Sequence, residues 1–111
     1  IVLAYAGATS SLIDAAREEG KGLVVAGMGR GNVPPGMVAG IERWLNESKP
    51  VVITSRAPRG RVGRTYGYFG GGRRLSELGA IFGGNRRPQQ ARIDLMLALG
   101  AGADPRAFIE R

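Results

Sequence analysis

The stretch GMGRGNVPPG, residues 27–36, combines four glycines, an arginine, an asparagine and two prolines, and it is the first candidate for chemistry in this chain. It follows an apolar run and precedes a helix-like segment, which is where glycine-rich loops hold phosphate groups. The phosphate-binding pattern is incomplete here. Asn32 replaces the third glycine of G-x-G-x-x-G, Pro34 and Pro35 remove amide donors, and no G-K-S/T follows. We therefore do not expect a nucleotide at this loop.

Asn32 is the residue of this stretch best suited to hold a polar ligand, because its amide offers donors and an acceptor without a charge. Asparagine is also common in turns, where its side chain bonds the nearby backbone. The residues alone favour the turn role and leave the ligand role open.

Other catalytic chemistry is largely excluded by composition. The chain has no cysteine and no histidine, which removes disulfides, thiol chemistry, Cys/His zinc sites and Ser–His pairs. The nine acidic residues show no ligand-like clustering, so we expect no metal and no cofactor. The hydroxyl groups lack a base and are expected to cap helices or bond strand ends; they belong to Ser10, Ser11, Thr54, Ser55 and Thr65. We expect no catalytic residue in this chain.

The formal net charge of +7 comes mostly from arginine, with Lys21 and Lys49 as the two lysines. A basic module that binds nucleic acid or phosphate is one interpretation of this charge. It would use Arg56, Arg59, Arg61, Arg64, Arg73 and Arg74. The other interpretation is a solvated, arginine-biased surface, which we favour because net charge bears on solubility more than on fold. We therefore do not expect nucleic acid as a partner.

Targeting signals are not visible in the sequence. No apolar run approaches the roughly 20 residues of a membrane span, and the first residues lack the pattern of a signal peptide. We expect no membrane partner and favour a cytoplasmic location, leaving an exported form open.

The elements that position these residues alternate between strands and helices. Apolar runs predict strands at 1–5, 23–26, 50–54 and 79–83. Helices are predicted at 11–20, from Pro34 or Pro35 to 45, at 88–99 and from Asp104 to the end. The pattern indicates a single α/β domain over 1–111, a three-layer, Rossmann-like fold of about four mostly parallel strands flanked by helices.

Three local features of these helices carry expectations. Ser11 and Asp14 resemble a capping box, and Gly20 provides a stop for the first helix. The helix at 88–99 is apolar nearly all round over its second half, which predicts a well-buried helix.

Two loops are expected at the carboxyl edge of the sheet, where α/β folds bind ligands. One is the stretch 27–36, and the other is the long arginine- and glycine-rich segment at 55–74, which contains Tyr66 and Tyr68. The glycine run at 70–72 has the composition of a flexible connector.

Four segments together resemble the C-terminal domain of bacterial L-asparaginases. They are GLVVAGMGRGNVPPGM, KPVVITSRAPRGRV, GAIFGG and PQQARIDLMLAL. The combination of G-x-G-x-G-N, S-R-x-P-x-G and P-Q-x-A-R, in this order, covers almost the whole chain. The resemblance implies a parent enzyme that converts L-asparagine, and by extension L-glutamine, through a threonine-bound acyl intermediate. It places the two nucleophilic threonines in a domain upstream of this chain. It also implies a homo-oligomer, dimer or tetramer, in which this domain reaches into a neighbour's active site.

Residue by residue, the resemblance assigns Asn32 to the substrate near its amino end and gives Gly29 and Gly31 a supporting role in the loop. Arg56 would brace the loop or the subunit interface. The family glutamate that reaches the partner's substrate has no counterpart, because residues 61–74 contain no carboxylate. Tyr66 or Tyr68 falls near that place, either as a substrate ligand or as a packing residue.

A second interpretation stays within amide chemistry. The asparaginase-like subunit of archaeal tRNA-dependent amidotransferases shares this module and supplies ammonia to a charged tRNA.

Overall fold

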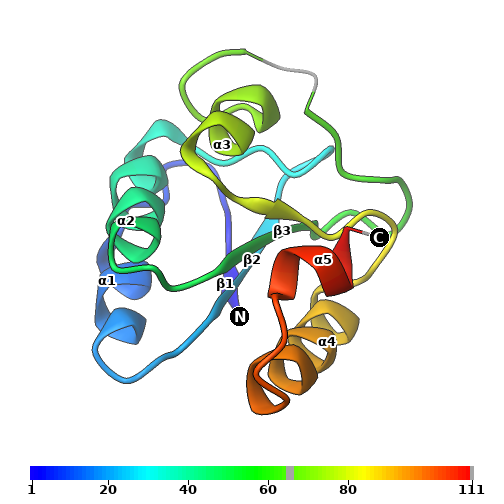
Figure 1. The fold of residues 1–111 in the computed structure, drawn as a ribbon. Coiled ribbons are helices and arrows are strands. Elements are labelled where there is room, and N and C mark those ends of the chain that lie inside the picture. Colours follow the sequence, from blue (N-terminus) through cyan, green and yellow to red (C-terminus); the bar gives the residue numbers. More distant parts are fainter. Residues whose placement is uncertain (65–66, 111) are drawn as a thin grey trace.

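The computed structural model describes residues 1–64 and 67–110, and these form a four-stranded parallel sheet between two layers of helices (Figure 1). The strands are β1 (Val2–Leu3), β2 (Leu23–Gly27), β3 (Val51–Ser55) and β4 (Ile81–Phe82). They lie in the order β1-β2-β3-β4, and the longest register pairs Leu23 with Val51 through Gly27 with Ser55. The predicted α/β architecture is confirmed.

Helices cover both faces of this sheet. They are α1 (Ser11–Arg17), α2 (Pro35–Asn46), α3 (Gly72–Leu78), α4 (Pro88–Gly100) and α5 (Pro105–Ile109). Figure 1 shows α1, α2 and α3 on one face and α4 with α5 on the other. Right-handed crossovers between successive neighbouring strands place all three connecting helices on the same face. The opposite face is covered only after β4.

Every residue of β2 and β3 is buried because each strand serves two cores. Alternate residues such as Val25 and Ile53 face the core beneath α1, α2 and α3. Val24 and Val52 face the smaller core beneath α4 and α5, with Leu95 packed against them.

Trp44 anchors the larger core and is fully buried. Its indole N–H donates to the backbone oxygen of Ile13 at 2.8 Å, which ties α2 to α1. A Cβ at Gly20 would lie 2.6 Å from the Trp44 ring. The missing side chain at Gly20 thus allows close packing. The first helix is shorter than predicted, because α1 ends at Arg17 with Glu18 as its C-cap, before Gly20 is reached.

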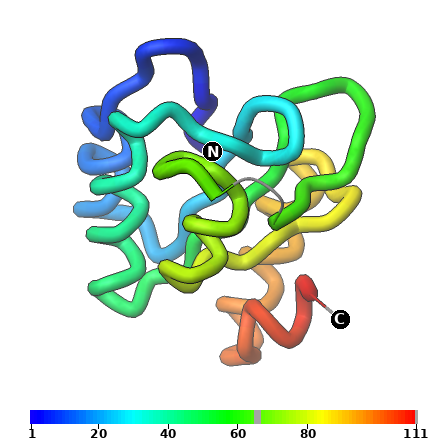
Figure 2. The backbone as a smooth tube through the Cα atoms, turned by 90° about the horizontal axis from the view of Figure 1, so that it is seen from above, coloured from blue at the N-terminus to red at the C-terminus, as the bar shows by residue number. Residues whose placement is uncertain are grey.

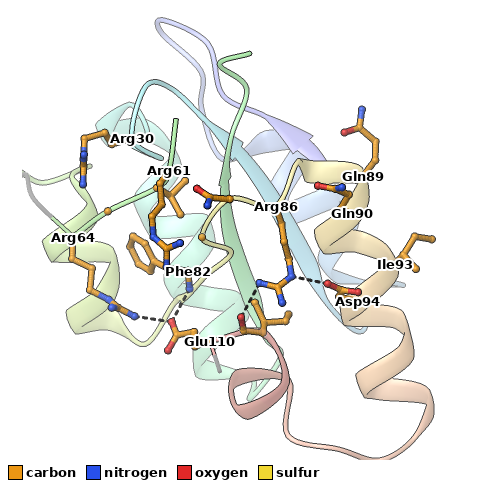
Figure 3. Close-up of a pocket in the computed structure, with 15 residues that line it drawn as sticks. Arg30, Arg61, Arg64, Phe82, Arg86, Gln89, Gln90, Ile93, Asp94 and Glu110 are labelled. Carbon is orange, nitrogen blue, oxygen red and sulfur yellow. Dashed lines mark hydrogen bonds and ion pairs between the residues drawn. The ribbon is translucent and has the colours of Figure 1, made fainter. Parts of the chain in front are cut away.

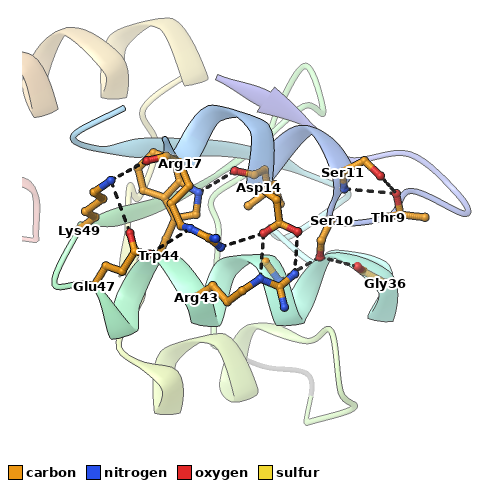
Figure 4. Close-up of polar contacts among 12 residues, drawn as sticks. Thr9, Ser10, Ser11, Asp14, Arg17, Gly36, Arg43, Trp44, Glu47 and Lys49 are labelled. Atoms are coloured by element: carbon orange, nitrogen blue, oxygen red, sulfur yellow. Dashed lines mark hydrogen bonds and ion pairs between the residues drawn. The ribbon is translucent and has the colours of Figure 1, made fainter. Parts of the chain in front are cut away.

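The predicted capping box at Ser11 and Asp14 is also wrong. Ser10 is the N-cap residue of α1, and it makes no side-chain capping bond. Asp14 instead accepts two bonds from the Arg43 guanidinium, at 2.9 and 2.7 Å, and one from Arg17 at 3.0 Å (Figure 4). The bond from Arg43 is the main cause that holds the pKa of this carboxyl below its ordinary value.

Helix α3 begins at Gly72, inside the segment 55–74 that was expected to be a loop, and continues past it to Leu78. The glycine run at 70–72 is buried, so the flexible-connector interpretation does not hold. Gly70 accepts a hydrogen bond from the backbone N–H of Val33 at 2.9 Å. A Cβ on Gly70 would lie far inside van der Waals contact with the Val33 oxygen, so these glycines permit close backbone approach.

Helix α4 is less buried than predicted. Ala91, Leu95 and Ala98 face the sheet, whereas Met96 and Leu97 are more than half exposed. A helix that covers a sheet can bury only one stripe of side chains, so the apolar residues outside that stripe remain at the surface. No helix within 1–64 or 67–110 is long and apolar enough to cross a membrane.

The last predicted helix is confirmed as α5. Its N-cap is Asp104, whose side chain accepts from the backbone N–H of Arg106 at 3.0 Å.

Candidate functional site

The loop after β2 is a tight turn closed by Met28 and Asn32. The Met28 N–H donates to the Asn32 oxygen at 2.7 Å, and the Asn32 N–H donates back to the Met28 oxygen at 2.9 Å. Gly29 and Gly31 inside the turn have φ values of +52° and +98°, which L side chains rarely adopt. The alternating glycines of G-x-G-x-G-N therefore have a structural cause in the backbone of this turn.

The end of β3 holds this turn in place. The Ser55 hydroxyl donates to the backbone oxygen of Gly29 and accepts from the Ala57 N–H. The Arg56 N–H donates to Gly27 at 2.7 Å, and its guanidinium donates to the backbone oxygen of Ala4 at 2.8 Å. Arg56 thus links the start of the segment after β3 to the last residue of β2 and to Ala4, which follows β1.

The side chain of Asn32 does not bond its own backbone. Its Oδ1 accepts from the backbone N–H of Gly72, the first residue of α3, at 3.2 Å. Because the first N–H groups of a helix have no partner within the helix, this bond satisfies one of them. It also fixes the amide orientation, and Nδ2 has no hydrogen-bond partner among the described residues. The structure therefore leaves the donor side of the Asn32 amide available.

The two predicted loops form one unit at the carboxyl edge of the sheet. The Gly63 N–H donates to the oxygen of Arg30 at 3.0 Å, in addition to the contacts of Val33 and Asn32 described above. Figure 2, seen from above, shows the turn beside the segment that follows β3. Tyr68 lies on this unit and is about half exposed. Tyr66 lies outside the described residues.

Buried hydroxyl groups near this edge are committed to backbone bonds. Thr54 donates to the oxygen of Val25 at 2.8 Å, and Ser10 donates to that of Gly36 at 2.7 Å. The bonds of Thr54 and Ser55 match the strand-end role expected of these hydroxyls. Ser10 does not cap its helix, the Ser11 hydroxyl bonds that of Thr9, and Thr65 lies outside the described residues. Residues 1–64 and 67–110 also hold no group of three acidic side chains that could bind a metal.

The structure reveals a cavity that sequence analysis did not predict. It has a volume of about 1140 Å³ and opens between the segment after β3, the segment after β4 and the start of α4 (Figure 3). Four arginines line it, namely Arg30, Arg61, Arg64 and Arg86. They come from three separate loops, so their spacing along the sequence did not predict that they line one cavity.

The six arginines proposed for nucleic acid have different environments. Arg56 is bound to Ala4, as described above, and Arg74 approaches Glu77 at 3.9 Å. Arg64 stacks on Phe82, 4.8 Å from the ring centroid, and pairs with Glu110 at 2.7 Å. These three guanidinium groups already have partners within the chain.

A sequentially ordered parallel sheet with a glycine-rich turn at its carboxyl edge defines a three-layer α/β domain. Residues 1–110 match the Glutaminase/Asparaginase C-terminal domain, and the chain belongs to that family.

Named proteins show the same relationship. The L-asparaginase of Bacillus licheniformis is 40% identical over 102 residues, which cover 91% of this chain and 32% of that protein. A glutamyl-tRNA(Gln) amidotransferase component of Pyrococcus abyssi is 35% identical over 101 residues, 90% of this chain and 23% of that protein. The crystal structure of a probable cytoplasmic L-asparaginase from Campylobacter jejuni superposes with a TM-score of 0.80 at 32% identity, over 98% of this chain and 34% of that one. The chain thus spans about a third of the length of the asparaginases it matches.

Proposed function

We propose that this chain is the part of an L-asparagine amidohydrolase that completes the active site of a neighbouring subunit. The observation that carries the proposal is the Asn32 amide, which the first N–H of α3 holds at the carboxyl edge of the sheet. Family membership supports the reaction class, and the committed hydroxyls agree with a nucleophile supplied from elsewhere.

The orientation of Asn32 decides what it offers to a substrate. Because Oδ1 is engaged by Gly72, the group turned to a ligand is the Nδ2 amide, which is a donor. Its natural acceptor on L-asparagine is the α-carboxylate, which sits beside the amino group at the amino end of the molecule. In this proposal Asn32 positions the substrate, while an upstream threonine attacks the side-chain amide and releases ammonia.

Several further features belong to the proposal. L-Glutamine is the second candidate substrate, and the parent is a homo-oligomer, a dimer or tetramer, because the site needs two protomers. Tyr66 and Tyr68 are the candidates for the substrate contact that the missing family glutamate would make. A cytoplasmic location is favoured, as the name of the Campylobacter relative states for that protein.

The test is ammonia release from L-asparagine and L-glutamine. We expect activity from the complete protein and none from the 111-residue chain alone, with activity restored when the chain is mixed with a separately made upstream domain. Steady ammonia release by the purified chain would show that a nucleophile lies within it and would overturn the proposal.

The second candidate is an amidotransferase component that supplies ammonia to a charged tRNA, which the similarity to the Pyrococcus abyssi protein supports. The two functions separate in one comparison. An asparaginase releases ammonia from the free amino acid without a partner, whereas an amidotransferase component requires its partner protein and a charged tRNA for productive transfer.

A further inference from the structure

The topology of the sheet creates a crevice between β3 and β4. The chain leaves β3 toward α3 on one face of the sheet, and it leaves β4 toward α4 on the other face (Figure 1). Two neighbouring parallel strands whose connections diverge in this way open a gap outside their carboxyl ends, and α/β folds bind ligands in such gaps. The cavity of about 1140 Å³ lies there, lined by Phe82 at the end of β4 and by Val62 from the segment after β3.

Both carboxylates of this cavity are already neutralised. Asp94 accepts from Arg86 at 2.6 Å. Glu110 accepts from Arg64 at 2.7 Å and from the backbone N–H of Phe82 at 2.8 Å (Figure 3). It also accepts from Arg106 at 3.2 Å.

Two guanidinium groups remain at the cavity without such a partner. Arg30 and Arg61 line it and are exposed, and within residues 1–64 and 67–110 neither has an ion pair or a side-chain hydrogen bond. The Arg61 guanidinium lies against Gly84, where an added Cβ would be 3.5 Å away. Arg30 lies across Gly63, where an added Cβ would clash with its guanidinium. The missing side chain at Gly63 therefore makes room for Arg30 at the crevice, while Arg61 lies in ordinary contact distance of Gly84.

Uncharged donors complete the lining. Asn85 and Gln89 contribute amide groups, and the positive end of the 13-residue helix α4 opens onto the same space. The unpaired arginines, the amides and the helix end all favour a negatively charged occupant.

We propose that the cavity between Arg30 and Arg61 binds a small multivalent anion that carries phosphate or carboxylate groups. Its volume suits a small molecule with several charged groups rather than a single orthophosphate ion. The site goes beyond the proposed amidohydrolase function and does not depend on it. Asn32 is not among the lining residues, since its side chain bonds α3.

The test is calorimetric titration of the complete protein with pyrophosphate and, separately, with citrate at constant ionic strength. The two probes distinguish a phosphate-bearing ligand from a carboxylate-bearing one, and binding of either supports the site. We expect the double variant Arg30→Gln/Arg61→Gln to raise the dissociation constant more than tenfold. Neither side chain holds another part of the described chain, so circular dichroism should show an unchanged fold.

The matched control is Arg74→Gln/Arg92→Gln, which removes the same charge from residues outside the cavity. We expect its dissociation constant to stay within about threefold of the parent value, because surface charges that do not line the cavity are screened by salt. If both double variants bound the probe equally more weakly than the parent, the effect would come from net charge alone, and the proposal would be overturned. Absence of binding by the parent protein at millimolar probe would also overturn it. Because heat of binding is measured without ammonia release, failure here leaves the amidohydrolase proposal standing, and the reverse also holds.

Discussion

Asn32 combines a role in the fold with a proposed role toward the substrate, and two substitutions separate them. Asn32→Ala removes both Oδ1 and Nδ2. Asn32→Asp keeps an oxygen acceptor for the Gly72 N–H but replaces the amide donor with a second acceptor.

The structural cost follows from the bond between Oδ1 and the Gly72 nitrogen, which is 3.2 Å long. Gly72 is buried, so the alanine variant leaves a helix N–H without a partner, at a cost of about 1–2 kcal/mol in the free energy of unfolding. The aspartate variant keeps the bond and puts a negative charge beside the positive end of α3, so its unfolding free energy should equal or exceed that of the parent.

The functional cost should be shared by both variants, because each loses the Nδ2 donor. We expect kcat/KM for L-asparagine in the complete enzyme to fall more than tenfold, or about 1.4 kcal/mol in transition-state stabilisation. Urea unfolding followed by circular dichroism gives the first quantity, and steady-state ammonia release gives the second. Asn46→Ala, an exposed asparagine at the end of α2, is the matched control and should change stability by less than about 0.5 kcal/mol.

Two results would refute this reasoning separately. Equal destabilisation by alanine and aspartate would show that the bond to Gly72 contributes nothing. An unchanged kcat/KM in both variants would return Asn32 to a purely structural role in the turn.

Two further predictions concern packing and charge. Gly70→Ala would press a Cβ against the backbone oxygen of Val33, which cannot rotate away, and should lower the free energy of unfolding in urea by about 3 kcal/mol. The control, Gly100→Ala, has open space around it and should leave stability unchanged or slightly raised. Equal effects of the two substitutions would contradict the packing argument. Asp14→Asn should lower the urea midpoint relative to the parent at pH 7, and this difference should shrink as the pH is lowered toward 3. The folded-state pKa of Asp14 is depressed below its ordinary value of 3.8, so its stabilising effect is present above that value and is lost as pH falls through the folded pKa. A midpoint difference that does not vary with pH would contradict this assignment.

The sequence predicted the strands and most of the helices because their signals are local. Strands β2, β3 and β4 are buried apolar runs, whereas β1 is an apolar run whose Leu3 is half exposed. Helices α2 and α5 carry a proline at or near their first position. Helix α3 was missed because its N-cap Gly71 and its first three residues read GGRR, which contains neither a polar capping residue nor an apolar side chain. Its position is set by contacts with distant backbone at Val33 and Asn32, which no local pattern encodes.

The candidate site, too, combines features that local sequence indicates with features that only the folded chain brings together. The supporting role of Gly29 and Gly31 came from the family resemblance, and their positive φ values agree with it, since glycine adopts positive φ without steric cost. The partner of Asn32 lies 40 residues away, and the cavity joins Arg30 to Arg61 across two loops. Such long-range contacts depend on the order of the strands in the sheet, and the distribution of charge along the sequence does not reveal them.

The single tryptophan of this chain makes its fluorescence a probe of only one of the two cores. Trp44 is sealed between α1 and α2, with its indole N–H on Ile13 and the Lys49 ammonium 5.5 Å from its ring centroid. Its fluorescence therefore senses the core beneath α1, α2 and α3, while the core beneath α4 and α5 contains no tryptophan. Loosening of α4 and α5 would leave the emission nearly unchanged although helical circular dichroism falls. Coincidence of the two signals during unfolding thus reports whether the sheet joins both cores into one cooperative unit.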